Sequence, residues 1–191
     1  MEISMSSFNP APELLADQWF NSAEPVTLQS LRGKVVAIEA FQMLCPGCVS
    51  HGIPQAQRVQ ETFSREDVVV LGLHTVFEHH QAMQPVSLEA FLQEYRVTFP
   101  VGVDRGDGQG IPATMQAYGM RGTPTLILVD KSGRLRQQWF GRPGDLIVGA
   151  EIMSLVKERQ SASAATSAAA LKRQEPIDGC DDAACAVRPH T

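Results

Sequence analysis

The stretch VVAIEAFQMLCPGC, residues 35–48, joins an almost continuous apolar run to two cysteines three residues apart. Residues 35–41 are rich in β-branched and other apolar side chains, which predicts a central strand covered on both faces. After Cys45 the apolar side chains recur near helical spacing as far as Phe63, and Pro46 suits the first turn of a helix. The sequence therefore predicts a strand, a junction that holds both cysteines, and a helix.

Further strands and helices are predicted along the chain as far as about residue 158. Strands are expected at 68–73, 97–103, 125–130 and 134–140, and helices at 87–96, 111–119 and 145–158. Such an order is typical of an α/β domain of three layers with a mixed central sheet. We assign this domain to residues 1–159. Residues 160–191 are rich in alanine and serine and then polar, so we expect a flexible linker and tail.

Composition limits the classes of partner. The 191 residues carry a formal net charge of -5, and their lysines and arginines form no basic stripe, which argues against nucleic acid and anionic lipid. The N-terminus lacks the basic start and apolar run of a secretory signal, and no segment is apolar enough to cross a bilayer. We therefore expect no membrane contact and a cytoplasmic location. A mature exported protein would share these features, and the oligomeric state stays open.

The cysteine pair has three possible meanings when only its spacing is considered: a redox dithiol, half of a metal site, or two small apolar neighbours. A thiolate at a helix N-terminus is stabilised by unpaired amides and by the helix dipole, and Cys45 is predicted at that position. Cys48 lies one turn further on, where it can attack a mixed disulfide formed at Cys45. This arrangement predicts a nucleophile and a resolving thiol.

Glu39 is an acidic residue inside an apolar strand, six positions before Cys45. A buried carboxyl has a raised pKa and can take a proton from Cys48 during resolution. The alternative is a strand-edge glutamate whose carboxylate lies in solvent. Its position alone does not choose between the two.

Two longer segments resemble the thioredoxin superfamily. They are IEAFQMLCPGC and YGMRGTPTLILVDKSGRLRQQWFG, and the resemblance covers roughly residues 10–158. The preceding PVTLQSLRGKVVAIEAF and the additional TFPVGVD unit are closer to the TlpA-like and redoxin branch. The resemblance implies a thioredoxin-like fold with an N-terminal extension and an inserted αβ unit. It also implies a cis peptide bond before Pro124, facing the dithiol, and a Thr123 backbone that pairs with an extended substrate.

The motif departs from the family pattern around the cysteines. Leu44 replaces the usual tryptophan, and Pro46-Gly47 replaces the usual Gly-Pro. We expect Leu44, Pro46 and Gly47, together with Thr123, to form the substrate-binding surface. Because these residues surround the thiolate, the redox potential and the direction of electron flow are not transferable from the family.

The leading functional hypothesis is a thiol-disulfide oxidoreductase that acts on protein disulfides or dithiols and uses an unknown thiol reductant. In it Cys45 attacks, Cys48 resolves, Glu39 moves the proton and Pro124 shapes the substrate groove. A peroxiredoxin-like thiol peroxidase is an alternative, but Ile38 and Gln42 stand where that family needs proline and threonine. No cofactor is expected.

A metal-binding chaperone on a thioredoxin fold is the other alternative, and it would need a wider cysteine spacing and a distal histidine. His74, His79 and His80 lack a cysteine or carboxylate at ligand spacing, so we expect a solvated loop there and no metal. In the tail, Cys180 and Cys185 form a second close pair. A tethered pair has a high effective concentration, so these cysteines are a possible redox relay to the first pair. Two inert thiols are the other interpretation.

Overall fold

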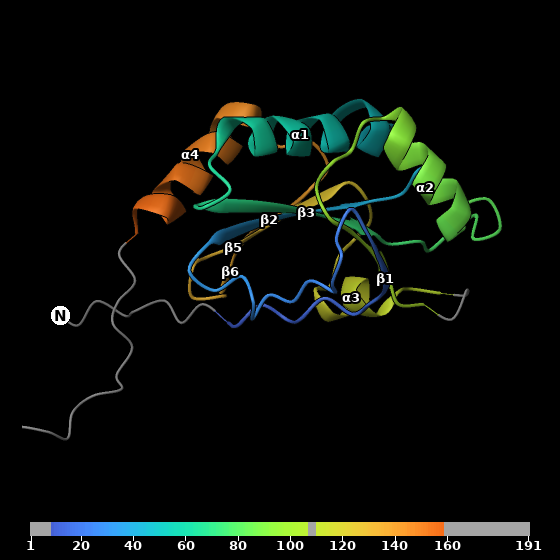
Figure 1. Cartoon of the computed structure of the whole chain (residues 1–191), viewed down its shortest axis with the longest axis horizontal. Coiled ribbons are helices and arrows are strands. Elements are labelled where there is room, and N and C mark those ends of the chain that lie inside the picture. Colours follow the sequence, from blue (N-terminus) through green and yellow to red (C-terminus); the bar gives the residue numbers. More distant parts are fainter. Residues whose placement is uncertain (1–8, 107–109, 159–191) are drawn as a thin grey trace, which may run out of the picture. The chain divides into compact units, whose positions relative to one another are not determined.

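The computed structural model describes residues 9–106 and 110–158, and its centre is strand β2 (Val35–Phe41) (Figure 1). All seven residues of β2 are buried. The six-stranded sheet has the order β1-β4-β3-β2-β5-β6. Strand β3 (Val68–His74) pairs with β2 in parallel, and β5 (Thr125–Val129) pairs with its other edge antiparallel. The predicted mixed sheet with a buried central strand is confirmed.

Helices cover both faces of this sheet. Figure 1 shows α1 (Ile53–Thr62), α2 (Pro85–Glu94) and α4 (Asp145–Lys157) on one face and α3 (Ala113–Ala117) on the other. Side chains of β2 alternate between two hydrophobic clusters, because successive residues of a strand point to opposite faces. The predicted three-layer arrangement is confirmed, and the register places Glu39 on the face covered by α1.

The two edges of the sheet come from distant parts of the chain. Strand β1 (Ala16–Phe20) pairs antiparallel with β4 (Val101–Asp104), and β6 (Leu135–Phe140) pairs antiparallel with β5. The unit inserted between β3 and α3 consists of α2 and β4, as the sequence predicts. The sequence analysis does not identify β1, because its residues ADQWF are partly or fully exposed and lack an apolar run.

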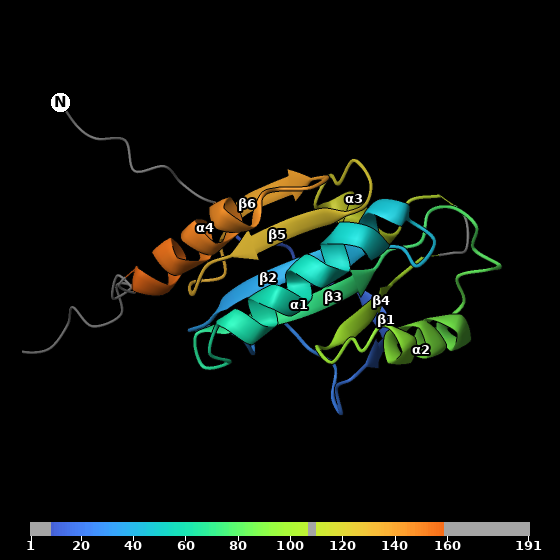
Figure 2. The same cartoon turned by 90° about the horizontal axis from the view of Figure 1, so that it is seen from above.

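The helix after the cysteines differs from its predicted form. Its helical backbone begins at Pro46 but passes through a π-helical turn, Cys48–Gly52, before α1. Pro54 lies within this helix and has no N–H to donate, which by itself would predict a kink. Instead the Ile53 N–H donates to the carbonyl of Cys48, five residues back, so the helix widens ahead of Pro54. Figure 2 shows α1 running over β2 and β3.

His74 contradicts the predicted solvated histidine loop. It ends β3, is 1% exposed, and packs with its ring centroid 5.3 Å from that of Phe41. Neither ring nitrogen has a hydrogen-bond partner within residues 9–106 and 110–158, and burial lowers the pKa of His74 to about 4. His79 is exposed, so the three histidines do not share one environment.

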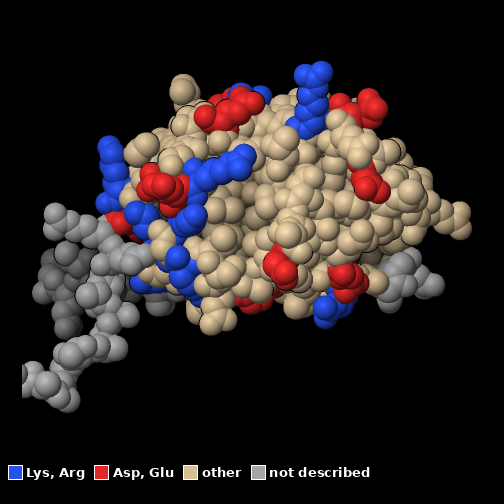
Figure 3. All heavy atoms as spheres, in the orientation of Figure 1, with Lys and Arg blue, Asp and Glu red and all other residues tan. Residues whose placement is uncertain are grey.

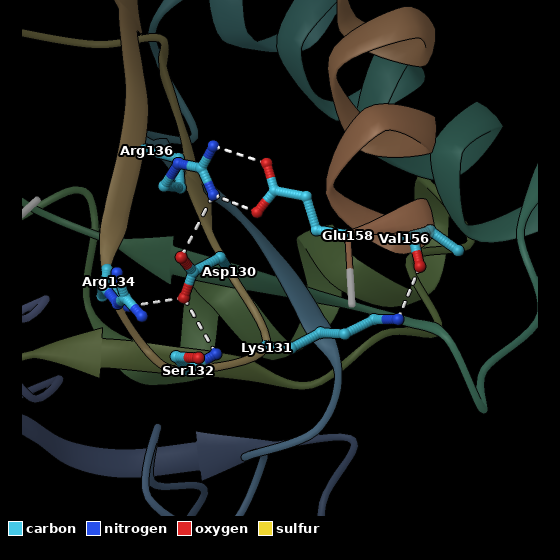
Figure 4. Close-up of polar contacts among 7 residues, drawn as sticks. All are labelled: Asp130, Lys131, Ser132, Arg134, Arg136, Val156 and Glu158. Atoms are coloured by element: carbon cyan, nitrogen blue, oxygen red, sulfur yellow. Dashed lines mark hydrogen bonds and ion pairs between the residues drawn. The ribbon is translucent and has the colours of Figure 1, made fainter. Parts of the chain in front are cut away.

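Polar contacts hold the end of α4 against the β5–β6 hairpin (Figure 4). The carboxylate of Asp130 accepts from the backbone N–H groups of Ser132 and Arg134 and pairs with Arg136. Arg136 also pairs with Glu158, just after α4. Because β5 is antiparallel to β2, this hairpin lies at the end of the sheet opposite to the cysteines. The loop before α4, in contrast, lies at the same end of the sheet as the cysteines.

The surface shows mixed charge. On the face in Figure 3, lysine and arginine side chains lie among aspartate and glutamate and form no continuous basic stripe. Within residues 9–106 and 110–158, no helix has the length and apolar character that a bilayer crossing requires.

Candidate active site

The two cysteines have different environments at the start of the helix that follows β2. Cys45 is partly exposed, whereas Cys48 is 0% exposed. The N–H of Cys48 donates to Cys45 Sγ at 3.3 Å, so the first sulfur receives a helix N-terminal amide. Such a donor stabilises a thiolate more than a thiol. The geometry suits Cys45 as the accessible nucleophile and Cys48 as the sheltered second thiol.

The Cys48 thiol is hard to ionise in this setting. Burial raises the pKa of Cys48, and the hydrogen bond with Cys45 raises it further. Cys48 is therefore a neutral thiol near pH 7, and its use as a nucleophile requires a base or a change in its surroundings.

Thr123 and Pro124 lie against the dithiol although they are far along the chain. The peptide bond between them is cis, the isomer that the family resemblance implies. The thiol of Cys45 contacts the carbonyl oxygen of Thr123 at 3.5 Å, and the carbonyl of Pro124 accepts from the N–H of Gly141 at 2.8 Å. The start of β5 and the end of β6 thus hold the proline beside Cys45.

Two glycines let the helix approach Pro124 closely. A Cβ on Gly47 would lie 3.1 Å from Pro124 Cδ, and a Cβ on Gly52 would lie 3.0 Å from Pro124 Cβ. The Cβ added at Gly52 would also lie 2.1 Å from Glu39 Oε1, closer than any non-bonded contact allows. The missing side chain of Gly52 therefore provides the space that the Glu39 carboxyl occupies.

Glu39 is buried and lacks a partner for one oxygen. The residue is 1% exposed, and its Oε1 has no hydrogen-bond partner among the described residues. Burial raises the pKa of Glu39 to about 8 because the charged form loses its hydration. The alternative of a strand-edge glutamate in solvent is wrong. A carboxyl with this pKa can both give and take a proton near neutral pH.

A groove of about 380 Å³ passes Cys45. Its lining residues come from the loops at this end of the sheet and comprise Leu44, Cys45, Pro46, Phe77, Glu78, His79, Gly122, Thr123 and Phe140. Leu44 is 56% exposed, so this predicted substrate-binding residue is free to contact a partner. Three predicted residues therefore line the groove, namely Leu44, Pro46 and Thr123. Gly47 instead lies against the Pro124 ring.

Gln42 was not predicted to have this positioning role. Its carbonyl accepts from the N–H of Cys45, and its buried side chain accepts from the N–H of Phe77 at 3.2 Å. The side-chain amide also reaches Glu78 Oε1 at 3.4 Å. Gln42 thereby links the cysteine turn to the opposite wall of the groove. A polar residue directly after the buried strand was the available signal.

Gly52 was also missed, since glycine inside a predicted helix only suggests a close approach and does not say to what.

The loop after β6 is fixed by the same helix. The Pro143 carbonyl accepts from Gln55 at 2.8 Å and lies 3.3 Å from a ring nitrogen of His51. Arg142 donates to the hydroxyl of Ser50 at 3.1 Å. Together these contacts hold the loop that carries the Gly141–Pro124 hydrogen bond.

Two predictions lie at the limit of what the structure describes. Cys180 and Cys185 fall outside the described residues, so their role as a relay stays a prediction. Within the described part of the chain, no three histidine, cysteine or acidic side chains are grouped so that they could hold a metal ion.

Comparisons with known proteins identify relatives of this chain. The sequence profile of the AhpC/TSA family matches residues 9–138. The thiol-disulfide oxidoreductase ResA of Halalkalibacterium halodurans is 25% identical over 135 residues, which cover 70% of this chain and 69% of ResA. The crystal structure of a thioredoxin-like superfamily protein is 62% identical, with a TM-score of 0.77 over 78% of this chain and 97% of that protein. A thiol-disulfide isomerase from Corynebacterium glutamicum is 48% identical, with a TM-score of 0.75 and the same coverage.

Replacing Gly52 by alanine tests the packing of the site. Because the new methyl group would meet Glu39 Oε1 and Pro124, we expect Gly52→Ala to lower the free energy of unfolding by about 1–3 kcal/mol. Gly149→Ala in α4 is the matched control, since its added Cβ meets nothing within 4 Å and alanine favours a helix. Urea unfolding measures both variants. Equal effects of the two substitutions would contradict the described contact.

Glu39→Gln tests the raised pKa. Between pH 4.5 and 8 the folded protein keeps Glu39 protonated while the unfolded chain ionises it, so stability falls as pH rises. The loss reaches about 1.4 kcal/mol per pH unit in that window. Glutamine does not titrate, so the free energy of unfolding of the variant relative to wild type should increase from pH 5 to pH 8.

Urea unfolding at the two pH values measures this difference, and Glu94→Gln on the exposed face of α2 is the control. A wild-type and Glu39→Gln pair whose stability difference stays the same at both pH values would show that Glu39 is not held neutral.

Proposed function

The chain belongs to the AhpC/TSA family and is a thiol-disulfide oxidoreductase, and we propose that Cys45 and Cys48 carry out its exchange with protein disulfides. One observation carries this assignment: a partly exposed sulfur receives a helix amide and lies beside the Thr123 carbonyl, while a buried second sulfur lies one turn away. The pairing of one accessible and one sheltered thiol is what a two-step exchange requires.

The first step is attack by the Cys45 thiolate on a substrate disulfide. A bond forms between Cys45 Sγ and one substrate sulfur, the substrate disulfide breaks, and the other substrate sulfur leaves as a thiolate. The substrate lies in the groove as an extended segment, with its backbone against Thr123. The exposed side chain of Leu44 provides an apolar contact beside the reacting sulfur.

The second step is resolution by Cys48. Its thiol passes a proton to the Glu39 carboxylate, and the resulting thiolate attacks Cys45 Sγ and releases the second substrate sulfur. The protein is left with a Cys45–Cys48 disulfide and the substrate with two thiols, so the two electrons are accounted for. Burial supports the need for a base here, because it raises the pKa of Cys48. Glu39 has a pKa of about 8, so an ionised fraction is present near neutral pH.

The same groups serve the reverse direction. When a thiol reductant opens the Cys45–Cys48 disulfide, Cys48 leaves as a buried thiolate, and a protonated Glu39 supplies the proton that it needs. We propose a thiol or dithiol protein as that reductant. A cytoplasmic location stays a prediction from the sequence.

The two alternative functions have weaker support. A peroxiredoxin-like peroxidase would use a hydroxyl group at position 42, but the Gln42 side chain is engaged with Phe77 and Glu78. A metal chaperone needs further ligands, and the described residues offer no group of three that could hold an ion. Neither alternative explains why Cys48 and the Glu39 carboxyl are both buried at this end of the sheet.

Trapping tests the exchange mechanism. Cys48→Ser removes the resolving thiol, so we expect it to accumulate mixed disulfides between Cys45 and a disulfide-containing model protein. Both variants also carry Cys180→Ser and Cys185→Ser, and Cys45→Ser is the matched control that should accumulate few, because its remaining thiol, Cys48, is buried and neutral. Non-reducing electrophoresis and mass spectrometry of the linked peptides measure both. If neither variant traps a partner, or both do so equally, the assigned roles are wrong.

A further inference from the structure

The groove at Cys45 has a different charge at each end. The sheet order β3-β2-β5-β6 places the loop after β3 at one end, the cysteine turn after β2 in the middle, and the end of β6 at the other end. The first end carries Glu78, and the second end carries Phe140, whose ring is contacted by Arg121 from outside the groove lining. We propose that this groove selects substrate segments that carry opposite charges on the two sides of the reacting cysteine.

Arg121 is positioned to bind a carboxylate. Its guanidinium carbon lies 5.3 Å from the centre of the Phe140 ring, and Gly122 allows this ring to close over the backbone, since a Cβ there would lie 3.0 Å from the ring. An aromatic ring does not take the place of a carboxylate acceptor, so the guanidinium N–H groups remain available for a bidentate contact with a substrate carboxylate. Arg121 is exposed, and in residues 9–106 and 110–158 no acidic side chain pairs with it.

Glu78 is positioned at the opposite end. The Gln42 amide contacts its Oε1 at 3.4 Å, and Gln42 is itself held by the N–H of Phe77. Glu78 is exposed, so its carboxylate also remains accessible to a basic side chain of a substrate. His79 is the other titratable group at this end. Arg142 is a nearby cation that does not line the groove, and it donates a hydrogen bond to the hydroxyl of Ser50.

The spacing of the two charges suits a short extended peptide. Three strand spacings of about 4.8 Å separate the ends of β3 and β6, so the charged ends lie on the order of 14 Å apart. An extended chain advances about 3.3 Å per residue, so this span corresponds to roughly four residues. Cys45 follows β2, one spacing from the end of β3 and two spacings from the end of β6, so the substrate charges should lie one or two residues from the cysteine on the Glu78 side and about three on the Arg121 side. Long lysine and glutamate side chains cover a difference of about one residue, so charges placed two residues before and two after the cysteine can meet both ends. The apolar groove residues between them, Leu44 and Phe140, contact the intervening side chains.

The inference rests on the proposed function, and its test uses the trapping reaction. Two blocked peptides, Glu-Ala-Cys-Ala-Lys and Lys-Ala-Cys-Ala-Glu, have the same composition and zero net charge. Each is supplied as a mixed disulfide with 2-mercaptoethanol and mixed at pH 8 with the Cys48→Ser protein, which also carries Cys180→Ser and Cys185→Ser. Cys45 Sγ bonds to the peptide sulfur, the peptide–mercaptoethanol bond breaks, and mercaptoethanol leaves as a thiolate that takes a proton from solvent.

Mass spectrometry gives the rate at which each peptide becomes linked to Cys45. We expect the peptide with one order of charges to react at least about fivefold faster than the other peptide. In the slower peptide, two like-charge contacts replace the two exposed ion pairs. The ratio should fall as salt is added. A double variant, Arg121→Glu with Glu78→Lys, should reverse the preferred order.

Single variants keep the test interpretable if the double variant does not fold. Arg121→Lys should retain the preference, and Arg121→Gln should reduce it. The control pair Arg65→Glu with Glu94→Lys makes the same charge changes at exposed residues outside the groove and should leave the ratio as it is.

Two results would overturn the proposal in different ways. If both peptides become linked at rates within about twofold of each other, or if the double variant does not reverse the order, the charged ends do not select substrates. If neither peptide nor the neutral Gln-Ala-Cys-Ala-Gln becomes linked at all, the exchange function itself is wrong.

Discussion

The burial of one carboxyl group in the middle of β2 is the constraint on which the site depends. The strand is covered on both faces, so the side chain of Glu39 has no route to bulk water and loses most of its hydration. The chain accommodates it by leaving Gly52 without a side chain, and this brings the carboxyl against both the helix and Pro124. A carboxyl that is costly to ionise therefore lies against the same helix start that carries Cys48, a thiol that is also costly to ionise.

The two sulfurs differ because of where the helix begins. Cys45 stands at the junction, where it is partly exposed and receives the N–H of Cys48, whereas Cys48 already lies beneath the first turn. The widened turn, Cys48–Gly52, has Gly47 directly before it and Gly52 as its last residue. Both glycines let the helix lie close to Pro124. One local departure from α-helical geometry therefore supports the accessible thiol, the sheltered thiol and the wall of the substrate groove.

The fold could be predicted from the sequence to a large extent, because β2 and its neighbours are apolar runs bounded by turn residues. The exception is β1, whose pairing with β4 depends on its partner and not on its own pattern. At the site, the dithiol and Pro124 could be identified from sequence motifs. The burial of Glu39 was undecided, because it depends on the space at Gly52, a contact between residues thirteen positions apart. The groove charges, Glu78 and Arg121, come from separate loops and are brought together only by the sheet order.

The central claim is that Glu39 exchanges a proton with Cys48 during resolution, and the pH dependence of that step tests it most directly. Stopped-flow measurement of the second thiol released in a single turnover isolates the step. The account predicts that the wild-type rate rises with pH and levels off above about pH 8, as Glu39 becomes ionised. In Glu39→Gln the rate should be at least about 100-fold lower at pH 7 and should keep rising with pH without levelling off. Equal rates and the same pH profile in the two proteins would contradict the account.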